Sequence, residues 1–537
     1  MHPPTPFIRR AAVPNHPAPD LVVTARRIHV LGDHSPVQAL LVRGGRIAAL
    51  GTVDEVRHAA LPGARTEHVD GVVTPGLTDA HVHLTLWALA RRRVDLNAAR
   101  TLDEGVAAVA RAASSGEGWV RGMGWDRHRW GGLPTRDPLD RVCPDRPAFL
   151  QSHDLHGAWV NGEALRRCGI TRDTPDPAGG HIVRGPDGEP TGVLLEKAVR
   201  LVESQLPPES PEEVRSALLD AQAEAHRLGL TGVHSVEVTG LEDFTAMELD
   251  GVLRLRVLQS IPLPRLDHAI GAALRSGFGG PWLRIGGVKM FLDGALGSRT
   301  AWMRQPFEGG APDDTGIRTL EPDAFRDHVR RAAQAGIAST VHAIGDAAVE
   351  LAIDVLGAAP RVAAMPHRIE HVQLCPPDLW ARAGASGLVG SMQPVHLVTD
   401  IPTAERHWGH ERSRGAYAFR PLANAGMRLA FGSDVPVETC DPRMGLFAAV
   451  RRVGWDGEPS DGWWMENAVT AEQALRAYTE GPAHAAGLEN RQGRLLPGYD
   501  ADLVAWDADP LDCAPDTLRE MRCLLTMVDG EVVQRAG

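Results

Sequence analysis

Short apolar runs and amphipathic segments alternate along most of the chain. One clear helix start is Ser210-Pro211-Glu212-Glu213, where serine can cap the helix and glutamate can complete a capping box. Apolar residues then recur at helical spacing until Gly229, which is a suitable residue to end a helix. An apolar run follows at once, at residues 231–236. This order of helix, glycine and apolar run predicts a helix followed by a buried strand.

Eight apolar runs of this kind predict eight strands. They lie near residues 72–76, 231–236, 253–260, 285–292, 338–343, 367–372, 388–393 and 428–433. Eight strands that alternate with helices are typical of an α/β protein with a closed parallel (β/α)8 barrel of the TIM type. Residues 100–208, between the first and second strands, hold a helix and several pieces rich in Gly and Pro. We interpret them as an insertion over the barrel mouth.

Both ends of the chain are rich in β-strand signals. Apolar runs at 21–24, 39–42 and 46–50 are separated by turns that contain glycine, and Asp529-Gly530 after the run at 524–528 predicts a hairpin. Chain ends often lie close together in folded proteins. We therefore expect the two ends to pack into one small sheet domain.

Composition narrows the class of partner. The chain has 537 residues and a net charge of -12, which disfavours a nucleic-acid surface. No stretch approaches the roughly 20 apolar residues of a membrane span, so no membrane partner is expected. None of the six cysteines forms a CxxC pair, and the first residues lack the apolar core of a secretion signal. We therefore expect a cytoplasmic protein.

Six candidate metal ligands stand at the ends of predicted strands. His81 and His83 are separated by one residue, and alternation along a strand would direct both imidazoles to one face. A single histidine is usually a surface or core residue, but together with a carboxylate such rings suit zinc or a similar divalent ion. The full candidate set is His81, His83, Lys289, His342, His371 and Asp434.

Lys289 lies in an otherwise apolar strand, where a lone ammonium group is unfavourable. Two interpretations remain open. Lys289 can form a salt bridge with Asp293, or it can be carbamylated by CO2 and so become an anion that bridges two metal ions.

Several segments together carry a resemblance to a known family. They are residues 75–83, 288–300, 342–346, 368–373 and 432–437, with 158–161 and 174–180 in the insertion. In these segments the chain resembles the amidohydrolase superfamily of metal-dependent hydrolases, and within it the branch of N-substituted formamide deformylase, amidohydrolase family 3. The resemblance covers nearly the whole chain.

The resemblance implies a (β/α)8 barrel at 71–484 and a flanking β-sandwich formed by both termini, 1–70 and 485–537. It implies that His81, His83, His342, His371 and Asp434 bind one or two divalent ions, zinc being the expected metal, with Lys289 as a carbamylated bridge. The implied reaction is cleavage of the C–N bond of a small N-substituted amide or formamide by metal-activated hydroxide. Asp434 would carry a proton from the water to the leaving nitrogen.

Four further residues are candidates at the site. His156 could stabilise the oxyanion or simply stabilise its loop, and Asp154 could contact substrate. The sequence around both residues departs from the pattern of the formamide deformylase branch. Trp125 could line an apolar pocket or pack the insertion against the barrel. Arg299 could hold a substrate carboxylate or stabilise its own loop.

Other functions stay open. A different activity on the same scaffold would be that of a cyclic amidase, lactonase or deaminase. Deaminases of the superfamily place a glutamate three residues after the fifth-strand histidine, where this chain has Gly345, so deamination is disfavoured. A catalytically silent scaffold is a third class, and retention of all candidate ligands argues against it. The sequence leaves open whether the protein forms a homo-oligomer.

Overall fold

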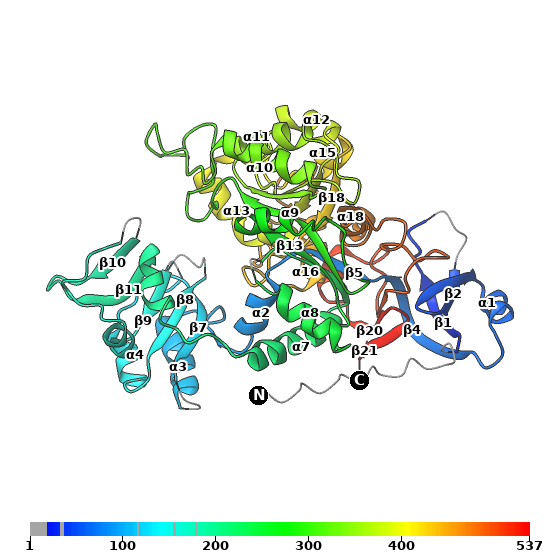
Figure 1. The fold of residues 1–537 in the computed structure, drawn as a ribbon, viewed down its shortest axis with the longest axis horizontal. Coiled ribbons are helices and arrows are strands. Elements are labelled where there is room, and N and C mark those ends of the chain that lie inside the picture. The colour runs from blue at the N-terminus through cyan, green and yellow to red at the C-terminus, as the bar shows by residue number, and fades with distance from the viewer. Residues whose placement is uncertain are drawn as a thin grey trace.

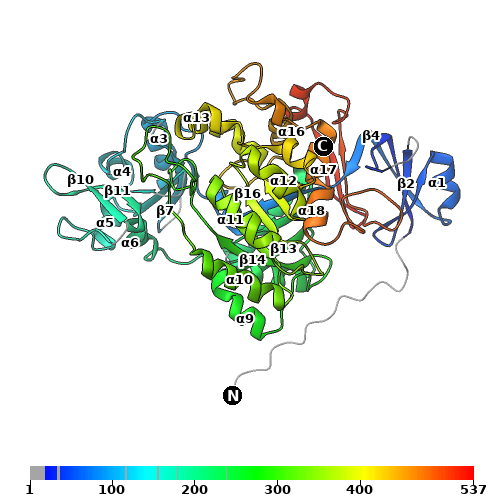
Figure 2. The ribbon, with the colours of Figure 1, turned by 90° about the horizontal axis from the view of Figure 1, so that it is seen from above.

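The computed structural model describes residues 19–32, 37–114, 118–127, 129–153, 157–177, 180–237 and 239–536. Three parts lie in a row (Figure 1). A barrel stands in the middle, a lobe formed by residues 94–203 lies on one side, and a sheet built from both chain ends lies on the other. Figure 2 shows the same order after a quarter turn.

An eight-stranded parallel sheet forms the barrel, in the order β18-β17-β16-β15-β14-β13-β12-β5. The bounds are β5 (Leu77–Val82), β12 (Leu230–Ser235), β13 (Arg256–Pro262), β14 (Leu283–Phe291), β15 (Ser339–Ala343), β16 (Arg368–His371), β17 (Val389–Met392) and β18 (Arg428–Phe431). Most of these strands are buried on both faces, which explains why their sequences are uninterrupted runs of mainly apolar residues. The predicted (β/α)8 architecture is confirmed.

The barrel closes where β5 meets the segment after β18. Asp434 N–H donates to the carbonyl of His81 at 2.8 Å, and His83 N–H donates to the carbonyl of Val435 at 2.9 Å. These bonds lie at the carboxyl ends of the strands, where TIM-barrel enzymes carry their active sites. Closure of the barrel therefore brings the two histidines beside Asp434.

The prediction that residues 72–76 form the first barrel strand is wrong. They belong to β4 (Arg65–Pro75), which pairs with strands of the terminal sheet, and the barrel strand is β5. Gly76 separates the two, and a Cβ there would lie 2.4 Å from Cγ2 of Thr231. One apolar stretch contributes a strand to each of two sheets, and its sequence alone does not show where the chain passes from one sheet to the other.

Helices cover the outside of the barrel. The predicted helix after Ser210 is confirmed as α7 (Pro211–Arg227), with a complete capping box between Ser210 and Glu213. The remaining helices of this part are α2 (Leu84–Ala90), α8 (Leu241–Leu249), α9 (Leu266–Gly271), α10 (Pro322–Gln334), α11 (Asp346–Gly357), α12 (Pro377–Ala385), α13 (Pro394–His407), α14 (His410–Ser413), α15 (Phe419–Asn424), α16 (Pro442–Arg451), α17 (Ala471–Tyr478) and α18 (Glu480–Ala485). Among the described residues, no helix combines the length and apolar character needed to cross a bilayer.

Both chain ends contribute to one seven-stranded sheet, the terminal sheet, in the order β21-β20-β19-β4-β1-β2-β3. Its other strands are β1 (Leu21–Ile28), β2 (Val37–Arg43), β3 (Arg46–Gly51), β19 (Leu503–Trp506), β20 (Cys523–Val528) and β21 (Glu531–Arg535), and α1 (Val53–Ala59) packs beside them. Asp529 and Gly530 form the predicted hairpin turn, with φ of 53° and 77°. The buried Arg256 of β13 joins barrel to sheet through a 2.6 Å ion pair with Asp502.

The lobe of residues 94–203, here called the insertion lobe, lies between β5 and β12 in the chain, as expected. A six-stranded sheet, β10-β11-β9-β8-β7-β6, forms its centre. Its elements are β6 (Val94–Asp95), α3 (Leu102–Ala113), β7 (Val120–Trp125), α4 (Asp137–Val142), β8 (Ala148–Ser152), β9 (Gly157–Val160), α5 (Gly162–Arg167), β10 (Gly180–Arg184), β11 (Pro190–Glu196) and α6 (Arg200–Glu203). Arg93 and Arg121 both contact Glu209, at 2.6 and 2.5 Å, and so tie the lobe to the segment before α7.

Candidate metal centre

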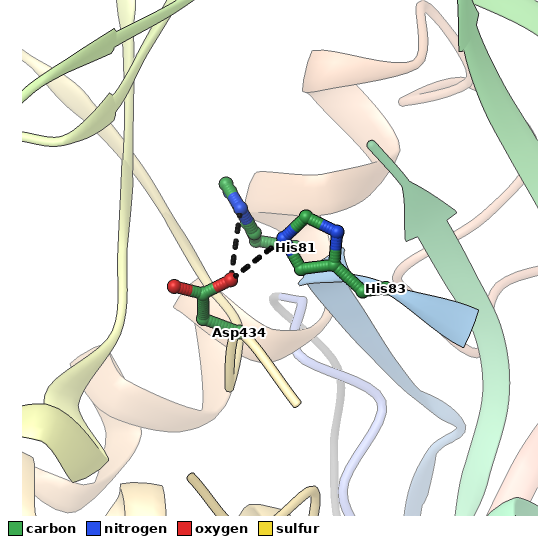
Figure 3. A group of neighbouring side chains, drawn as sticks. All are labelled: His81, His83 and Asp434. Carbon is green, nitrogen blue, oxygen red and sulfur yellow. Dashed lines mark ion pairs between the residues drawn. The ribbon is translucent and has the colours of Figure 1, made fainter. Parts of the chain in front are cut away.

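Three side chains converge at the closure of the barrel (Figure 3). The Nε2 atoms of His81 and His83 lie 3.3 and 3.2 Å from Oδ1 of Asp434. One ligand atom from each of the three residues lies within 4.8 Å of the others. His81 belongs to β5, but His83 is the N-cap of α2, outside the strand. Strand alternation is therefore not what directs His83, which reaches the carboxylate from the start of a helix.

The backbone around Asp434 is shaped to present this carboxylate. Asp434 has a φ of 62°, a left-handed conformation that costs about 1–3 kcal/mol and is typical of functional sites. The buried Asp79 accepts from His81 N–H at 3.1 Å and from Ser433 N–H at 2.9 Å, so it joins the two segments. A Cβ on Gly432 would lie 2.6 Å from Oδ1 of Asp79. Only glycine leaves room for this junction.

Two more imidazoles lie against this group. The ring centroid of His371 is 4.8 Å from that of His81 and 4.5 Å from that of His342. His371 Nδ1 contacts Oε1 of Gln393 at 2.8 Å, and His342 Nε2 contacts the Gly294 carbonyl at 3.0 Å. Because each of these partners is an oxygen acceptor, the contacting nitrogen carries the proton. One nitrogen of each ring therefore keeps its lone pair free for a cation.

A buried chain of charged groups supports His81. His81 Nδ1 donates to Oε2 of Glu370 at 2.5 Å, and Arg368 Nε forms an ion pair with Oε1 of the same carboxylate at 2.6 Å. Arg368 Nη1 in turn lies 2.8 Å from Nδ1 of His234 on β12. Burial acts to raise the pKa of Glu370, but Arg368 and His81 outweigh it and lower the pKa to about 2. Glu370 is thus a carboxylate that orients His81.

Lys289 points into the same interior, and no described residue forms a hydrogen bond with its Nζ. It is 4% exposed, and its Nζ lies 4.9 Å from the ring centroid of Phe291. Asp293 accepts instead from the backbone N–H groups of Gly345 and Trp302, at 2.8 and 2.9 Å. The described structure contains no salt bridge between Lys289 and Asp293. Burial lowers the pKa of Lys289 to about 8, although Glu370 and Asp434 partly oppose this.

The electrostatics of the group suit a divalent cation. Burial acts to raise the pKa of Asp434, yet His81 and His83 hold it well below its usual range, so the carboxylate is ionised. Burial lowers the pKa of His342 to about 3 and that of His371 well below its usual value, so both rings are neutral. Asp434 Oδ1 is buried and accepts no hydrogen bond from any described residue. An ionised carboxylate beside neutral imidazoles matches the donor set that zinc and similar ions prefer.

Two other predicted site residues, Trp125 and Arg299, are not part of this group. Trp125 is buried in the apolar core of the insertion lobe, where its Nε1 donates to the Leu150 carbonyl at 2.8 Å. Arg299 forms an ion pair with Asp314 of its own loop. Asp154 and His156 lie outside the described residues. A substrate or catalytic role for these four residues stays a prediction.

Sequence reasoning missed the residues that support the ligands: Asp79, Arg368, Glu370 and Gln393. A signal for two of them was present. Arg368 and Glu370 alternate in the buried four-residue strand β16, and buried charges at such positions need partners. Alternation along a strand is compatible with a mutual pair, but no feature of the sequence indicates that Glu370 also reaches His81 on β5.

Comparison with known proteins agrees with this architecture. The profile of the Amidohydrolase family matches residues 70–534. N-substituted formamide deformylase of Arthrobacter pascens is 33% identical over 543 residues, covering 95% of this chain and 97% of that protein. The Bacillus subtilis protein YtcJ is 30% identical over 522 residues, covering 94% and 97%.

A crystal structure of an uncharacterized metal-dependent hydrolase from Pyrococcus horikoshii has a TM-score of 0.78 and 26% identity. The match covers 93% of this chain and 99% of that chain. Family profile, relatives and fold agree over nearly the full length. The chain therefore belongs to the amidohydrolase family and is a hydrolase that acts on carbon–nitrogen bonds.

Proposed function

We propose that the protein hydrolyses the C–N bond of a small N-substituted amide or formamide at the centre around Asp434. The observation that carries this proposal is the ionised, buried Asp434. Its Oδ1 lies 3.3 and 3.2 Å from His81 and His83 and has no hydrogen-bond donor within the described part of the chain. A buried acceptor without a donor is unfavourable unless a ligand completes it.

In the proposed site, five side chains hold one or two divalent ions, with zinc as the best-matched metal. They are His81, His83, His342, His371 and Asp434. A cation bound by them would polarise the substrate carbonyl and make water nucleophilic near neutral pH. Glu370 and Gln393 orient His81 and His371 toward it through their Nδ1 atoms.

Asp434 has the position of the proton carrier. Its Oδ1 faces the histidine pair, and its second oxygen, Oδ2, faces the side of the site where His396 lies. We propose that the carboxylate takes the proton of the attacking water and delivers it to the leaving nitrogen. A fixed carboxylate suits this shuttle because its left-handed backbone and the bond from Asp434 N–H to His81 hold it in place.

Lys289 is proposed to be carbamylated. Its amine is buried and has no hydrogen-bond partner in the described ranges, and only the neutral amine reacts with CO2. A pKa of about 8 leaves a substantial neutral fraction near physiological pH, unlike that of an exposed lysine near 10.4. The resulting carbamate would place a further anion in the centre and would remove the unfavourable burial of an ammonium group.

The substrate class rests on similarity and on one steric observation. The relative from Arthrobacter pascens is a deformylase of N-substituted formamides, which makes formyl and small acyl amides the first choice. A deaminase-type glutamate is absent at Gly345, and a Cβ there would lie 2.1 Å from the Trp302 carbonyl oxygen. We further propose that the protein acts in the cytoplasm.

A screen with metal-free and zinc-loaded enzyme tests the proposal. N-formyl and N-acyl amines are supplied, and released amine is measured beside bound zinc. We expect zinc-dependent amine release, and loss of both zinc and activity in His81→Ala. His268→Ala is the control, because this histidine is exposed on α9. Full zinc occupancy in His81→Ala would contradict the ligand set, and stoichiometric zinc without turnover of any amide would contradict the reaction.

A further inference from the structure

A buried histidine that the proposed function leaves without a role stands beside Asp434. His396 lies in the first turn of α13, directly after β17. Its Nε2 is 3.7 Å from Oδ2 of Asp434, the oxygen that His81 and His83 do not approach most closely. The residue is 8% exposed, and Nε2 has no hydrogen-bond partner among the residues that the structure describes. Its ring centroid lies 6.4 Å from that of His371.

An unpartnered nitrogen at this position points to a ligand. A buried donor or acceptor left unsatisfied is unfavourable, and native structures rarely keep one without reason. The 3.7 Å separation from Oδ2 is too long for a hydrogen bond, so Asp434 does not satisfy His396. A substrate atom that enters beside Asp434 would come within reach of Nε2.

The surroundings determine what Nε2 offers. A lone pair directed at a carboxylate oxygen would be repelled, so the nitrogen that faces Asp434 carries a hydrogen. Asp400 and Glu438 also lie close enough for electrostatic interaction with His396. Each has another partner: Tyr417 donates to Asp400, and Thr399 donates to Glu438 at 2.7 Å. The Nε2–H group is therefore left free for a substrate acceptor.

We propose, resting on the amide hydrolysis proposed above, that His396 is a catalytic residue whose Nε2–H donates to the substrate carbonyl oxygen. As the water oxygen bonds to the acyl carbon, the π electrons of the carbonyl group move to the carbonyl oxygen. The hydrogen bond from His396 to this carbonyl oxygen then strengthens without proton transfer. When the C–N bond breaks, these electrons reform the carbonyl and Asp434 supplies the proton to nitrogen. His396 thus takes the oxyanion role for which sequence reasoning considered His156.

The size of the effect follows from the charge. Loss of one oxyanion donor lowers kcat by about 10²–10³-fold in enzymes of known mechanism. The donor meets full negative charge only in the tetrahedral species, so substrate binding should change little. A residue that merely supported Asp434 would instead change zinc binding as well.

The test compares His396→Ala and the near-isosteric His396→Gln with wild type and with His268→Ala, all zinc-loaded. Bound zinc, kcat, KM and thermal unfolding are measured, together with the Kd of an alkylphosphonate whose tetrahedral P–O⁻ group mimics the oxyanion. For His396→Ala we expect kcat and phosphonate affinity to fall by about 10²–10³-fold, with zinc content and KM little changed. His396→Gln, which keeps an N–H donor, should recover part of both losses.

Two results would overturn the inference while leaving the proposed function intact: unchanged phosphonate affinity in both variants, or losses that track zinc content. If His396→Ala does not fold, His396→Leu decides in its place, because leucine fills the site but offers no donor. Wild-type kcat and wild-type phosphonate affinity in His396→Leu would overturn the inference. Absence of amide turnover by the wild-type enzyme would instead defeat the proposed function itself.

Discussion

Oε2 of Glu370 lies 2.5 Å from Nδ1 of His81, although the two residues are 289 positions apart in the chain. The carboxylate is fully buried and is also held by Arg368. Because Nδ1 is the donor in this bond, the Nε2 lone pair of His81 is left free for a cation. Strand β16 thus sets the orientation of a proposed ligand on β5.

Glu370→Gln should weaken zinc binding. Glutamine can keep the shape and an acceptor oxygen but loses the charge that strengthens the bond to His81 and balances Arg368. We expect zinc affinity to fall about 10–100-fold, measured by competition with a chelator. Glu350→Gln is the control, because Glu350 lies on the outer surface of α11 with Arg304 and Arg382. Equal affinity in both variants would argue against orientation by Glu370.

Asp434→Asn should remain folded and bind zinc yet be nearly inactive. Asparagine keeps an oxygen that can face the histidine pair, but it cannot accept a proton from water. We expect kcat to fall about 10²–10⁴-fold, with zinc content measured on the same sample. Asp461→Asn, at an exposed loop position, provides the matched control. Unchanged turnover in Asp434→Asn would remove this carboxylate from the mechanism.

Lys289 should give a carbamate signal. The chain contains only two lysines, Lys197 and Lys289, among 56 basic residues, and Lys197 is exposed. With ¹³C-bicarbonate, we expect one carbamate resonance that is lost in Lys289→Met and kept in Lys197→Met. Lys289→Ala should lose activity, and a short carboxylic acid should restore part of it. A spectrum that is the same in all variants would show that Lys289 is not the modified residue.

The burial of His226, which is not one of the proposed ligands, should make the stability of the protein depend on pH. It is buried in α7, its Nε2 donates to the Arg254 carbonyl, and burial lowers its pKa to about 4. The unfolded chain, with a histidine pKa of about 6.5, binds more protons between these values, so the free energy of unfolding falls as pH drops from 6.5 to 4. The loss amounts to about 3 kcal/mol. In His226→Gln, the free energy of unfolding measured with denaturant should fall less between pH 6.5 and 4 than it does in the wild type. An identical fall in both proteins would show that His226 is not the residue responsible.

Gly432→Ala should disturb the metal centre without replacing a proposed ligand. A Cβ there would lie 2.6 Å from both Asp79 Oδ1 and His81 N, so these groups must shift. We expect lower zinc occupancy and a lower unfolding temperature. Gly271→Ala is the comparison, because a Cβ at this position in α9 meets nothing within 4 Å and alanine favours the helix. Normal zinc occupancy in Gly432→Ala would show that the junction tolerates movement.

The sequence by itself determined the elements that depend on local physics. The capping residues of α7, the hairpin at Asp529-Gly530 and the buried strands were readable because caps, turns and apolar runs are set by neighbouring residues. It also determined the family, through motifs that span the chain.

Only the tertiary structure decided which distant groups meet. It divided one apolar region at Gly76 between two sheets, and it paired Glu370 with His81 rather than Lys289 with Asp293. It also brought His396 to the free side of Asp434. The physical reason is that a buried charge must find a partner, and closure of the barrel, which joins residues hundreds of positions apart, determines which partners lie within reach.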